Sequence, residues 1–382
     1  MNQSKAPTPD LAVFVSFSGE GGVERMVLNL VNALADKGLR VDLLLIKSGS
    51  RHLEEIHPSV RRIELAAGHT LTSLPPLIRY LKRVHPPCLL AAKDRAGRIA
   101  VIARALAGCG DTRLALRLGT NLTAAFAHKA PWRMRLRQLP IRLLYPHIDT
   151  IICVSEGVRQ DTLAVSGIDP TRVKVIRNPV ITAQLLRAAA EPSPHPWLSQ
   201  PDQPVILGVG RLTLQKDFQT LLRAFAQLRS TRPCRLIILG DGRERETLLA
   251  LAGSLGVEED LSLPGFTPNP YAYMQRADLF VLSSRWEGSP NVLTEAMALG
   301  TPVVSSDCPS GPSELLEQGS IAPLVSVGDW RGLAEAMAKV LENPPAREQL
   351  RQAVREYTAE TSATCYLETL GLAPSNNDAA VD

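Results

Sequence analysis

Four features that many proteins carry are scarce or absent in this 382-residue sequence. No apolar run approaches the roughly 18 residues that a membrane-spanning helix needs. The six cysteines are scattered with no Cys-x-x-Cys pair, which argues against a disulfide framework or a zinc site and indicates reduced thiols. Aromatic residues make up only 4%, so no base-stacking platform for nucleic acid is visible. No Asp-x-Asp pair occurs, although many enzymes that handle nucleoside diphosphates use one to hold a metal.

The composition that remains is that of a soluble globular protein, with 45% hydrophobic and 21% charged residues. The chain is long enough for two domains. The first apolar run, 11–17, lacks the basic flank and cleavage site of a signal peptide, and a cytoplasmic location is therefore expected.

The net charge of +4 conceals an asymmetry between the two halves. Residues 1–180 contain 26 basic and 14 acidic residues, whereas residues 181–382 contain 16 and 24. A basic first half indicates an anionic partner, and an anionic membrane surface fits better than nucleic acid.

Short apolar runs alternate with helical patterns along the whole chain. Continuous apolar runs of this length predict parallel strands that are buried on both faces. We expect strands at 11–17, 41–46, 88–92, 114–118, 150–154, 173–176, 205–209, 236–240, 279–283, 302–305 and 322–325.

The pattern occurs twice, which predicts an α/β protein with two doubly wound domains. We expect an N-terminal domain at 1–182, a proline-rich linker at 183–203, and a second domain at 204–346. The segment 347–382 is expected to form a helix that crosses back to the first domain, followed by a frayed tail. Ligands of such sheets bind at the carboxyl ends of the strands, so a site facing a cleft between the domains is expected.

The segment 285–300 is the most informative part of the sequence. A helix is expected to start near Pro290, with Ser289 as its N-cap, and to end before Gly300. Its free amides form an anion site, and Gly288 lets a ligand approach the backbone. Glu287 and Glu295 can accept hydrogen bonds from sugar hydroxyls, although isolated carboxylates are usually only solvated.

An arginine and a lysine, Arg211 and Lys216, follow the expected strand 205–209 and its terminal Gly210. Both side chains suit phosphate groups, although Arg211 can equally pair with a surface acid. The turn at 240–242 is interpreted as structural.

Taken in order, Arg211, Lys216 and the stretch from Glu287 to Glu295 resemble the retaining nucleotide-sugar glycosyltransferases of family 4, which have the GT-B fold. The glycines around Gly21 and Gly22 match the N-terminal loop of that family, and the resemblance covers most of the chain. It implies that Arg211 and Lys216 hold the donor diphosphate, that Glu295 binds the ribose, and that Glu287 faces the transferred sugar.

The resemblance assigns further residues to the donor. The backbone at Pro290, Asn291 and Val292 would cap a phosphate or a sugar hydroxyl, with the N–H groups of Asn291 and Val292 as donors. Gly265 and Phe266 would lie beside the base. Gly21 and Gly22 would approach the diphosphate from the first domain.

The resemblance also implies retention of configuration, without a metal or another cofactor, because the cationic groups take the place of the metal. A UDP-sugar donor, a glycan or lipid-linked acceptor, and a role in bacterial surface polysaccharide synthesis are expected.

The acceptor side is less clear in the sequence. Family members often carry a histidine after the strand that corresponds to 114–118, and none stands there in this chain. No general base is therefore assigned. Candidate acceptor residues follow two expected strands, and they are Lys93, Asp94, Arg95, Thr120 and Asn121.

A basic segment at 129–145 has apolar residues on one helical face, which fits either a helix on an anionic membrane or a core-facing helix. Its basic residues are Lys129, Arg133, Arg135, Arg137 and Arg142. Two other functions stay open: a nucleotide-sugar epimerase of the same fold, and a non-catalytic nucleotide-sugar-binding partner of a membrane assembly.

Overall fold

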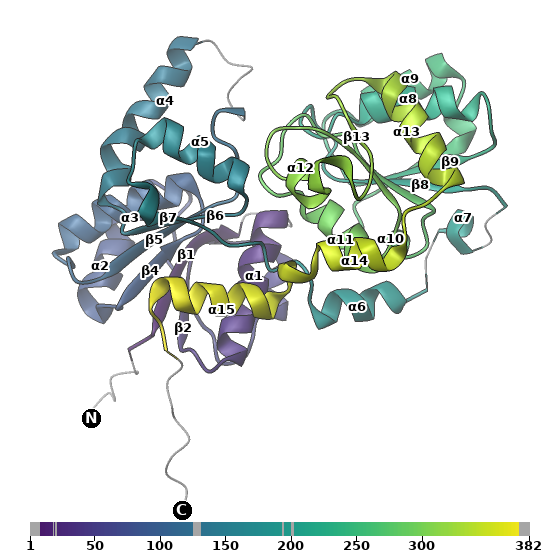
Figure 1. Ribbon diagram of the computed structural model, residues 1–382. Helices are drawn as coiled ribbons and strands as arrows, with labels where there is room; N and C mark the ends of the chain where they lie inside the picture. The colour runs from purple at the N-terminus through teal and green to yellow at the C-terminus, as the bar shows by residue number, and fades with distance from the viewer. Residues whose placement is uncertain are drawn as a thin grey trace, which may run out of the picture. The chain divides into compact units, whose positions relative to one another are not determined.

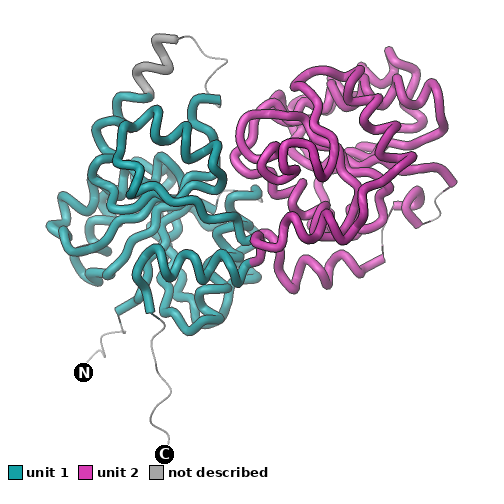
Figure 2. The backbone as a smooth tube through the Cα atoms, in the orientation of Figure 1, with its two compact units in different colours: residues 1–179, 359–382 teal, residues 180–358 magenta. Residues whose placement is uncertain are grey.

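The computed structural model describes residues 8–17, 19, 21–124, 131–192, 195–199 and 202–373, with the backbone alone at 131–137. The chain divides into two compact units (Figure 2). Unit 1 comprises the residues up to Pro179 and the C-terminal segment from Ala359, and unit 2 comprises Val180–Thr358. No helix among these residues is both long and apolar enough to cross a membrane.

The described part of unit 1 contains a seven-stranded parallel sheet in the order β3-β2-β1-β4-β5-β6-β7 (Figure 1). Its strands are β1 (Leu11–Phe17), β2 (Val41–Ser48), β3 (Arg61–Glu64), β4 (Cys88–Ala91), β5 (Arg113–Leu118), β6 (Thr150–Cys153) and β7 (Val173–Val175). Its longer helices are α1 (Gly22–Asp36), α2 (Leu74–Val84), α3 (Asp94–Ala107), α4 (Pro131–Leu144), α5 (Glu156–Ser166) and α15 (Ala359–Leu370).

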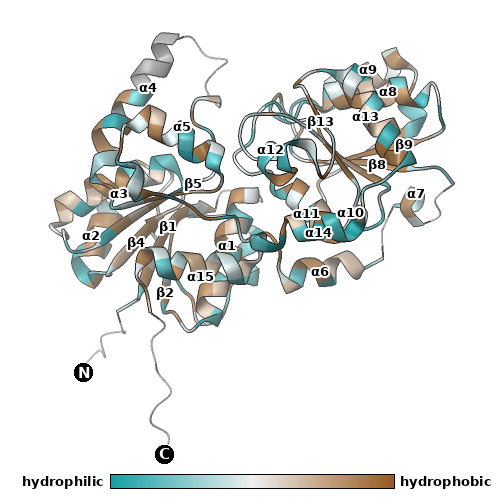
Figure 3. Ribbon diagram, in the orientation of Figure 1, coloured by the Kyte–Doolittle hydropathy of each residue, from teal (hydrophilic) through white to brown (hydrophobic). Residues whose placement is uncertain are grey.

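Helices cover both faces of this sheet. Apolar residues of α2, α3, α4 and α5 form the core on one face. Residues of α1 and of the returning helix α15 form the core on the other face, where Tyr366 is fully buried. The apolar residues lie along the central strands (Figure 3), as expected for strands buried on both faces.

The described part of unit 2 contains a six-stranded parallel sheet in the order β10-β9-β8-β11-β12-β13. Its strands are β8 (Val205–Val209), β9 (Arg235–Leu239), β10 (Leu261–Gly265), β11 (Leu279–Leu282), β12 (Val303–Ser306) and β13 (Leu324–Val325). Its helices include α6 (Ala183–Ala190), α7 (Pro196–Ser199), α8 (Phe218–Arg229), α9 (Arg245–Leu255), α10 (Tyr271–Met274), α11 (Asn291–Leu299), α12 (Pro312–Leu315), α13 (Trp330–Glu342) and α14 (Arg347–Ala353).

The core on one face of this second sheet is built with α8, α9 and α13. Helix α11 contacts β11 and β12 but contributes nothing to that core, so it lies on the other face. In both sheets the strand order reverses beside the first strand, between β1 and β4 and between β8 and β11. These two switch points are where doubly wound sheets bind ligands.

Two boundaries differ from the expectation. The segment 183–203 is not a simple linker, because α6 and α7 within it belong to unit 2. Helix α6 is attached to that unit by a hydrogen bond of 2.9 Å from the Asn269 side chain to the Ala188 carbonyl. The helix expected from residue 347 is broken: α14 stays with unit 2, and only α15 packs in unit 1. At the break, Thr358 leaves the helical conformation and forms a parallel bridge with Ile181.

Candidate functional site

Most of the residues expected to bind the donor lie in unit 2, several of them in the loops at the switch point between β8 and β11, whereas Gly21 and Gly22 lie in unit 1. Arg211 and Lys216 lie in the loop after β8, and Glu287 lies in the loop after β11. The Lys216 Nζ donates to Glu287 Oε1 at 2.7 Å, and both side chains are largely buried. The structure thus joins two residues that are 71 positions apart in the sequence.

A second hydrogen bond fixes the Glu287 carboxylate. The Ser284 hydroxyl donates to the same Oε1 at 2.7 Å, and the Ser306 hydroxyl donates to the Ser284 carbonyl at 2.6 Å. No described group donates to Glu287 Oε2, which leaves that oxygen for a ligand hydroxyl. Lys216 and Ser284 therefore hold the carboxylate in one orientation before any ligand binds.

Further side-chain hydrogen bonds join the loop after β8 to the loop after β11. Gln215 Nε2 donates to the Trp286 carbonyl at 2.9 Å, and the Ser283 hydroxyl donates to the Lys216 carbonyl at 2.8 Å. Arg285 Nε donates to the buried Asp217 carboxylate at 2.9 Å. None of these residues stands out in the sequence, because its partner lies in a distant loop.

Glycines allow the close approach that the site needs. A Cβ atom on Gly210 would lie 2.9 Å from Cε of Lys216, so only glycine lets the lysine stem pass there. Cβ atoms on Gly240 and Gly242 would lie 2.1 and 2.2 Å from the carbonyl oxygens of Gly210 and Leu212. The turn at 240–242 therefore packs against the backbone of the loop 210–212, which agrees with its interpretation as a structural turn.

Arg211 differs from Lys216 in its surroundings. Its side chain is exposed, and its guanidinium has no hydrogen-bond or ion-pair partner among the described residues. The alternative of pairing with a surface acid is thus not what the structure shows. The guanidinium is free to take a phosphate.

The helix expected near Pro290 is α11, which begins one residue later at Asn291 and ends at Gly300 in a left-handed cap. Pro290 takes the N-cap position instead of Ser289. Gly288 and Glu295 are buried, whereas Asn291 and Val292 are partly exposed at the first turn. Their amides are therefore close to the surface beside Glu287.

The stretch after β10 is also in this unit. Gly265 has a φ of 89°, and the amide of Phe266 donates to Asp241 Oδ2 at 2.9 Å. The Phe266 ring is 49% exposed. It offers a flat apolar surface at the carboxyl end of the sheet.

A cysteine lies close to this site but is not suited to chemistry. Burial raises the pKa of the Cys308 thiol to about 12, and the nearby Glu287 carboxylate acts in the same direction. The thiol therefore stays neutral and is not a nucleophile.

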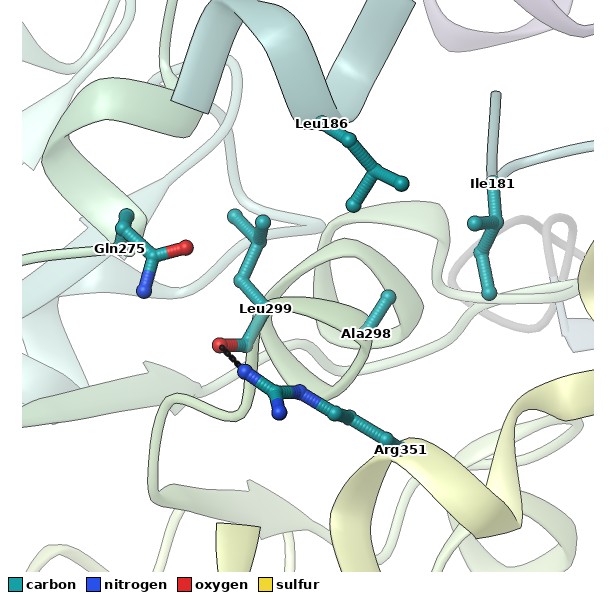
Figure 4. Close-up of a pocket in the computed structure, with 6 residues that line it drawn as sticks. All are labelled: Ile181, Leu186, Gln275, Ala298, Leu299 and Arg351. Carbon is teal, nitrogen blue, oxygen red and sulfur yellow. Dashed lines mark hydrogen bonds between the residues drawn. The ribbon is translucent and has the colours of Figure 1, made fainter. Parts of the chain in front are cut away.

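A pocket of about 320 Å³ lies elsewhere in unit 2 (Figure 4). It is lined by Ile181, Leu186, Gln275, Ala298, Leu299 and Arg351. Arg351 donates to the Leu299 carbonyl at 3.4 Å, at the carboxyl end of α11. The pocket therefore lies at the opposite end of the helix from the candidate donor site.

The acceptor-side residues and the N-terminal glycines lie in unit 1, around the switch point between β1 and β4. Gly21 is the N-cap of α1, and a Cβ there would lie 2.6 Å from Oε2 of Glu24. Lys93 Nζ donates to Glu24 Oε1 at 2.8 Å, which links the ends of β1 and β4. Gly22 is the first helical residue, beside this pair.

The other acceptor candidates divide into two kinds. Asp94 accepts hydrogen bonds from Arg98 and Tyr145, and Asn121 Oδ1 accepts from the amide of Ala124, so both side chains maintain local structure. Arg95 and Thr120 are exposed.

Of the basic segment, Lys129 and the side chains of Arg133, Arg135 and Arg137 fall outside the described residues. Helix α4 carries the rest of the segment, where Leu139 and Leu143 are 55% and 61% exposed. Arg142 Nε donates to the Val165 carbonyl at 3.1 Å. At these described positions the leucines face outward rather than into the core.

Family models match both parts of the chain: Glycosyltransferase Family 4 over residues 20–184 and Glycosyl transferases group 1 over residues 191–357. The chain belongs to the family 4 glycosyltransferases. It has the GT-B type of fold, with two Rossmann-like domains, and family membership is consistent with retention of configuration.

Curated relatives align over nearly the whole length of this glycosyltransferase. One is the N-acetylgalactosamine-N,N'-diacetylbacillosaminyl-diphospho-undecaprenol 4-alpha-N-acetylgalactosaminyltransferase of Campylobacter jejuni, with 29% identity over 93% of this chain and 95% of the relative. Another is the lipopolysaccharide core biosynthesis glycosyltransferase LpsE of Rhizobium meliloti, with 29% identity over 94% and 98%. The crystal structure of Anabaena HepE with UDP and glucose matches with a TM-score of 0.75 and 20% identity, over 95% of this chain and 99% of HepE.

Proposed function

We propose that this glycosyltransferase moves a sugar, with retention and without a metal, from a UDP-sugar to a lipid-linked saccharide or glycan in bacterial surface polysaccharide synthesis. The observation that carries the proposal is the Lys216–Glu287 pair at the switch point of unit 2, beside the unpaired guanidinium of Arg211. The relatives act on a diphospho-undecaprenol-linked sugar and in lipopolysaccharide core synthesis, and HepE binds UDP.

In the proposed reaction, the bond between the anomeric carbon and the diphosphate oxygen breaks, and a bond to the acceptor oxygen forms. Negative charge grows on the leaving diphosphate, and positive charge grows on the sugar. In the proposal, Arg211, Lys216 and the first amides of α11 stabilise the leaving group, which would allow transfer without a metal. Glu287 would face the sugar through its second carboxylate oxygen.

Retention follows in this scheme if the acceptor attacks from the side that the diphosphate leaves. The acceptor proton then passes to a departing phosphate oxygen, so the reaction needs no general base from the protein. This route agrees with the acceptor side, where the sequence offers no histidine. The separation of carboxylates is no guide, because the rule that links it to stereochemistry concerns hydrolases.

The remaining donor contacts are proposed on the same basis. Glu295 would accept hydrogen bonds from the ribose hydroxyls, and Gly265 and Phe266 would lie beside the base. Gly21 and Gly22 would approach the diphosphate from unit 1. Lys93, Asp94, Arg95, Thr120 and Asn121 would border the acceptor.

The experiment that tests this function is incubation with a panel of nucleotide sugars, UDP-sugars first, while the release of nucleoside diphosphate is followed. Release that depends on an added lipid-linked saccharide supports transfer. Interconversion of the sugar without release would identify an epimerase, and tight binding without turnover would identify a non-catalytic partner.

We also propose that the enzyme works in the cytoplasm, at the inner face of the cytoplasmic membrane. The exposed Leu139 and Leu143 on the basic helix α4 suit insertion into an anionic surface. Co-sedimentation with vesicles at low salt tests this, with the doubly substituted Leu139→Asp, Leu143→Asp chain as the matched variant. Equal recovery with neutral and anionic vesicles would contradict the membrane contact.

A further inference from the structure

Unit 1 contains a buried arginine that lacks a carboxylate partner. Arg117 lies in β5, where it interrupts the buried apolar run 114–118, and it is 2% exposed. Its Nη2 donates to the Asn178 side-chain oxygen, and the Tyr366 hydroxyl of α15 interacts with the guanidinium. No ion pair with Arg117 occurs in the described part of the chain.

This arrangement costs free energy. Burial lowers the pKa of the Arg117 guanidinium, because the charged form loses its water. Buried charges in proteins are normally paired, since an unpaired one pays the desolvation cost without compensation. In addition, Nη1 of Arg117 is shielded from solvent and donates to no described group. An uncompensated cation of this kind requires an explanation.

The unpartnered nitrogen lies under the loop that follows β5. A Cβ atom on Gly119 would be only 3.1 Å from Arg117 Nη1, so the guanidinium is covered there by a residue without a side chain. Thr120, the next residue, is exposed. The positive charge is therefore close to the protein surface at this one place.

The loop itself is held firmly. The amides of Leu122 and Thr123 donate to the Asp161 carboxylate, the first at 2.6 Å. Strand β5 lies beside β4 in the sheet, and the carboxyl end of β4 leads to Lys93. The Lys93 ammonium is paired with Glu24, whereas the buried Arg117 has no carboxylate partner among the described residues.

We infer that the surface of the loop 119–121 binds a phosphate or diphosphate group of the acceptor, attracted by the Arg117 guanidinium beneath Gly119. The assignment of this phosphate to an acceptor rests on the proposed function. The anion site itself can be tested without turnover. A charge in a poorly solvated interior acts strongly over a few ångströms, and it needs no direct contact to attract an anion.

The test measures binding of inorganic pyrophosphate to the full chain by calorimetry. The Arg211→Ala, Lys216→Ala chain serves as background, because it removes the proposed donor phosphate site. We expect Arg117→Met in this background to weaken pyrophosphate binding by about tenfold or more, with Arg117→Lys between the two. Geranyl diphosphate, which has the same head group, tests whether the phosphate belongs to a lipid. If it binds more tightly than pyrophosphate, the site recognises a lipid diphosphate. If the two bind equally, the site recognises only the anion.

The control is Arg40→Met, which removes an equal charge at the start of β2, the opposite edge of the same sheet, and should leave binding unchanged. If Arg117→Met does not fold, Gly119→Ala tests the same point, because its methyl group displaces the loop over Nη1. Unchanged pyrophosphate binding in the folded Arg117 variant, or in Gly119→Ala, would overturn the inference and leave Arg117 as a structural residue with a buried water. Pyrophosphate binding that depends on Arg117, found together with no turnover of any nucleotide sugar by the unsubstituted chain, would instead count against the proposed function alone.

Discussion

Lys216 in unit 2 and Arg117 in unit 1 are both largely buried cations near the carboxyl ends of parallel strands, yet their surroundings are opposite. Lys216 has a carboxylate at 2.7 Å, which a serine also holds. Arg117 has an amide and a phenol hydroxyl but no carboxylate. The first site is balanced in charge before a ligand arrives, whereas the second carries an excess of positive charge.

The same contrast extends to the whole units. By sequence, unit 1 has 26 basic and 18 acidic residues, and unit 2 has 16 basic and 20 acidic residues. The net negative charge of unit 2 does not attract a diphosphate, so a donor site there would depend on individual cationic side chains held in a defined geometry. A basic unit attracts anionic acceptors over a longer range, so its individual contacts can be fewer.

The largest effect is expected from the donor side. Arg211→Ala, Lys216→Ala and Glu295→Ala should each reduce turnover by about 10²–10³-fold, because they remove groups that act on the leaving diphosphate or the ribose. Steady-state rates of nucleoside diphosphate release, with circular dichroism to check folding, measure this. Lys339→Ala, at an exposed position on α13, is the control. Near-normal rates in all three variants would refute the site.

A glycine substitution tests whether the lysine needs its present position. Gly210→Ala would place a methyl group 2.9 Å from Cε of Lys216 and push the ammonium away from Glu287. We expect turnover to fall by about tenfold or more, since small displacements of catalytic groups are costly. Gly253→Ala is the matched control, because its Cβ meets nothing closer than 3.6 Å. Full activity of Gly210→Ala would show that the lysine adjusts freely.

The serine that holds Glu287 should have a smaller influence. Ser284→Ala removes one of two hydrogen bonds to Oε1 and should lower kcat several-fold, worth about 1 kcal/mol, with little change in KM for the donor. Ser284→Thr should restore most of the rate. A drop in stability without a change in kcat would mean that Ser284 supports the fold alone.

The smallest effect is expected beside Arg117. Tyr366→Phe removes a buried hydroxyl and should cost about 1 kcal/mol of unfolding free energy, or roughly 2–4 °C in Tm. Differential scanning calorimetry measures this shift. An unchanged Tm would show that the hydroxyl does not stabilise the guanidinium.

The fold was largely predictable because apolar runs mark strands that are buried on both faces. The ranges expected for β1 and β8 match the structure, and the other expected strands agree within about two residues. Two strands, β3 and β10, were missed. Both lie at sheet edges, and their residues are mostly partly exposed or exposed, so no continuous apolar run identifies them.

The candidate site was predictable only for residues that stand out locally. Lys216 and Glu287 follow strands in recognisable motifs, whereas Ser284 and Gln215 become relevant only through contacts between distant loops. Arg117 did carry a local signal in the sequence: a single charge inside the apolar run 114–118. A lone charge in a buried strand is rare enough to deserve notice.

The returning helix α15 has a consequence for how the enzyme is made. Unit 2 is continuous in sequence, so the ribosome completes it before unit 1 has received its last helix. Until then, the face of the first sheet that Ala363, Tyr366 and Leu367 cover stays open. Synthesis from the N-terminus therefore finishes the later domain first, and a nascent chain that stops before residue 359 leaves the earlier one with an exposed apolar face.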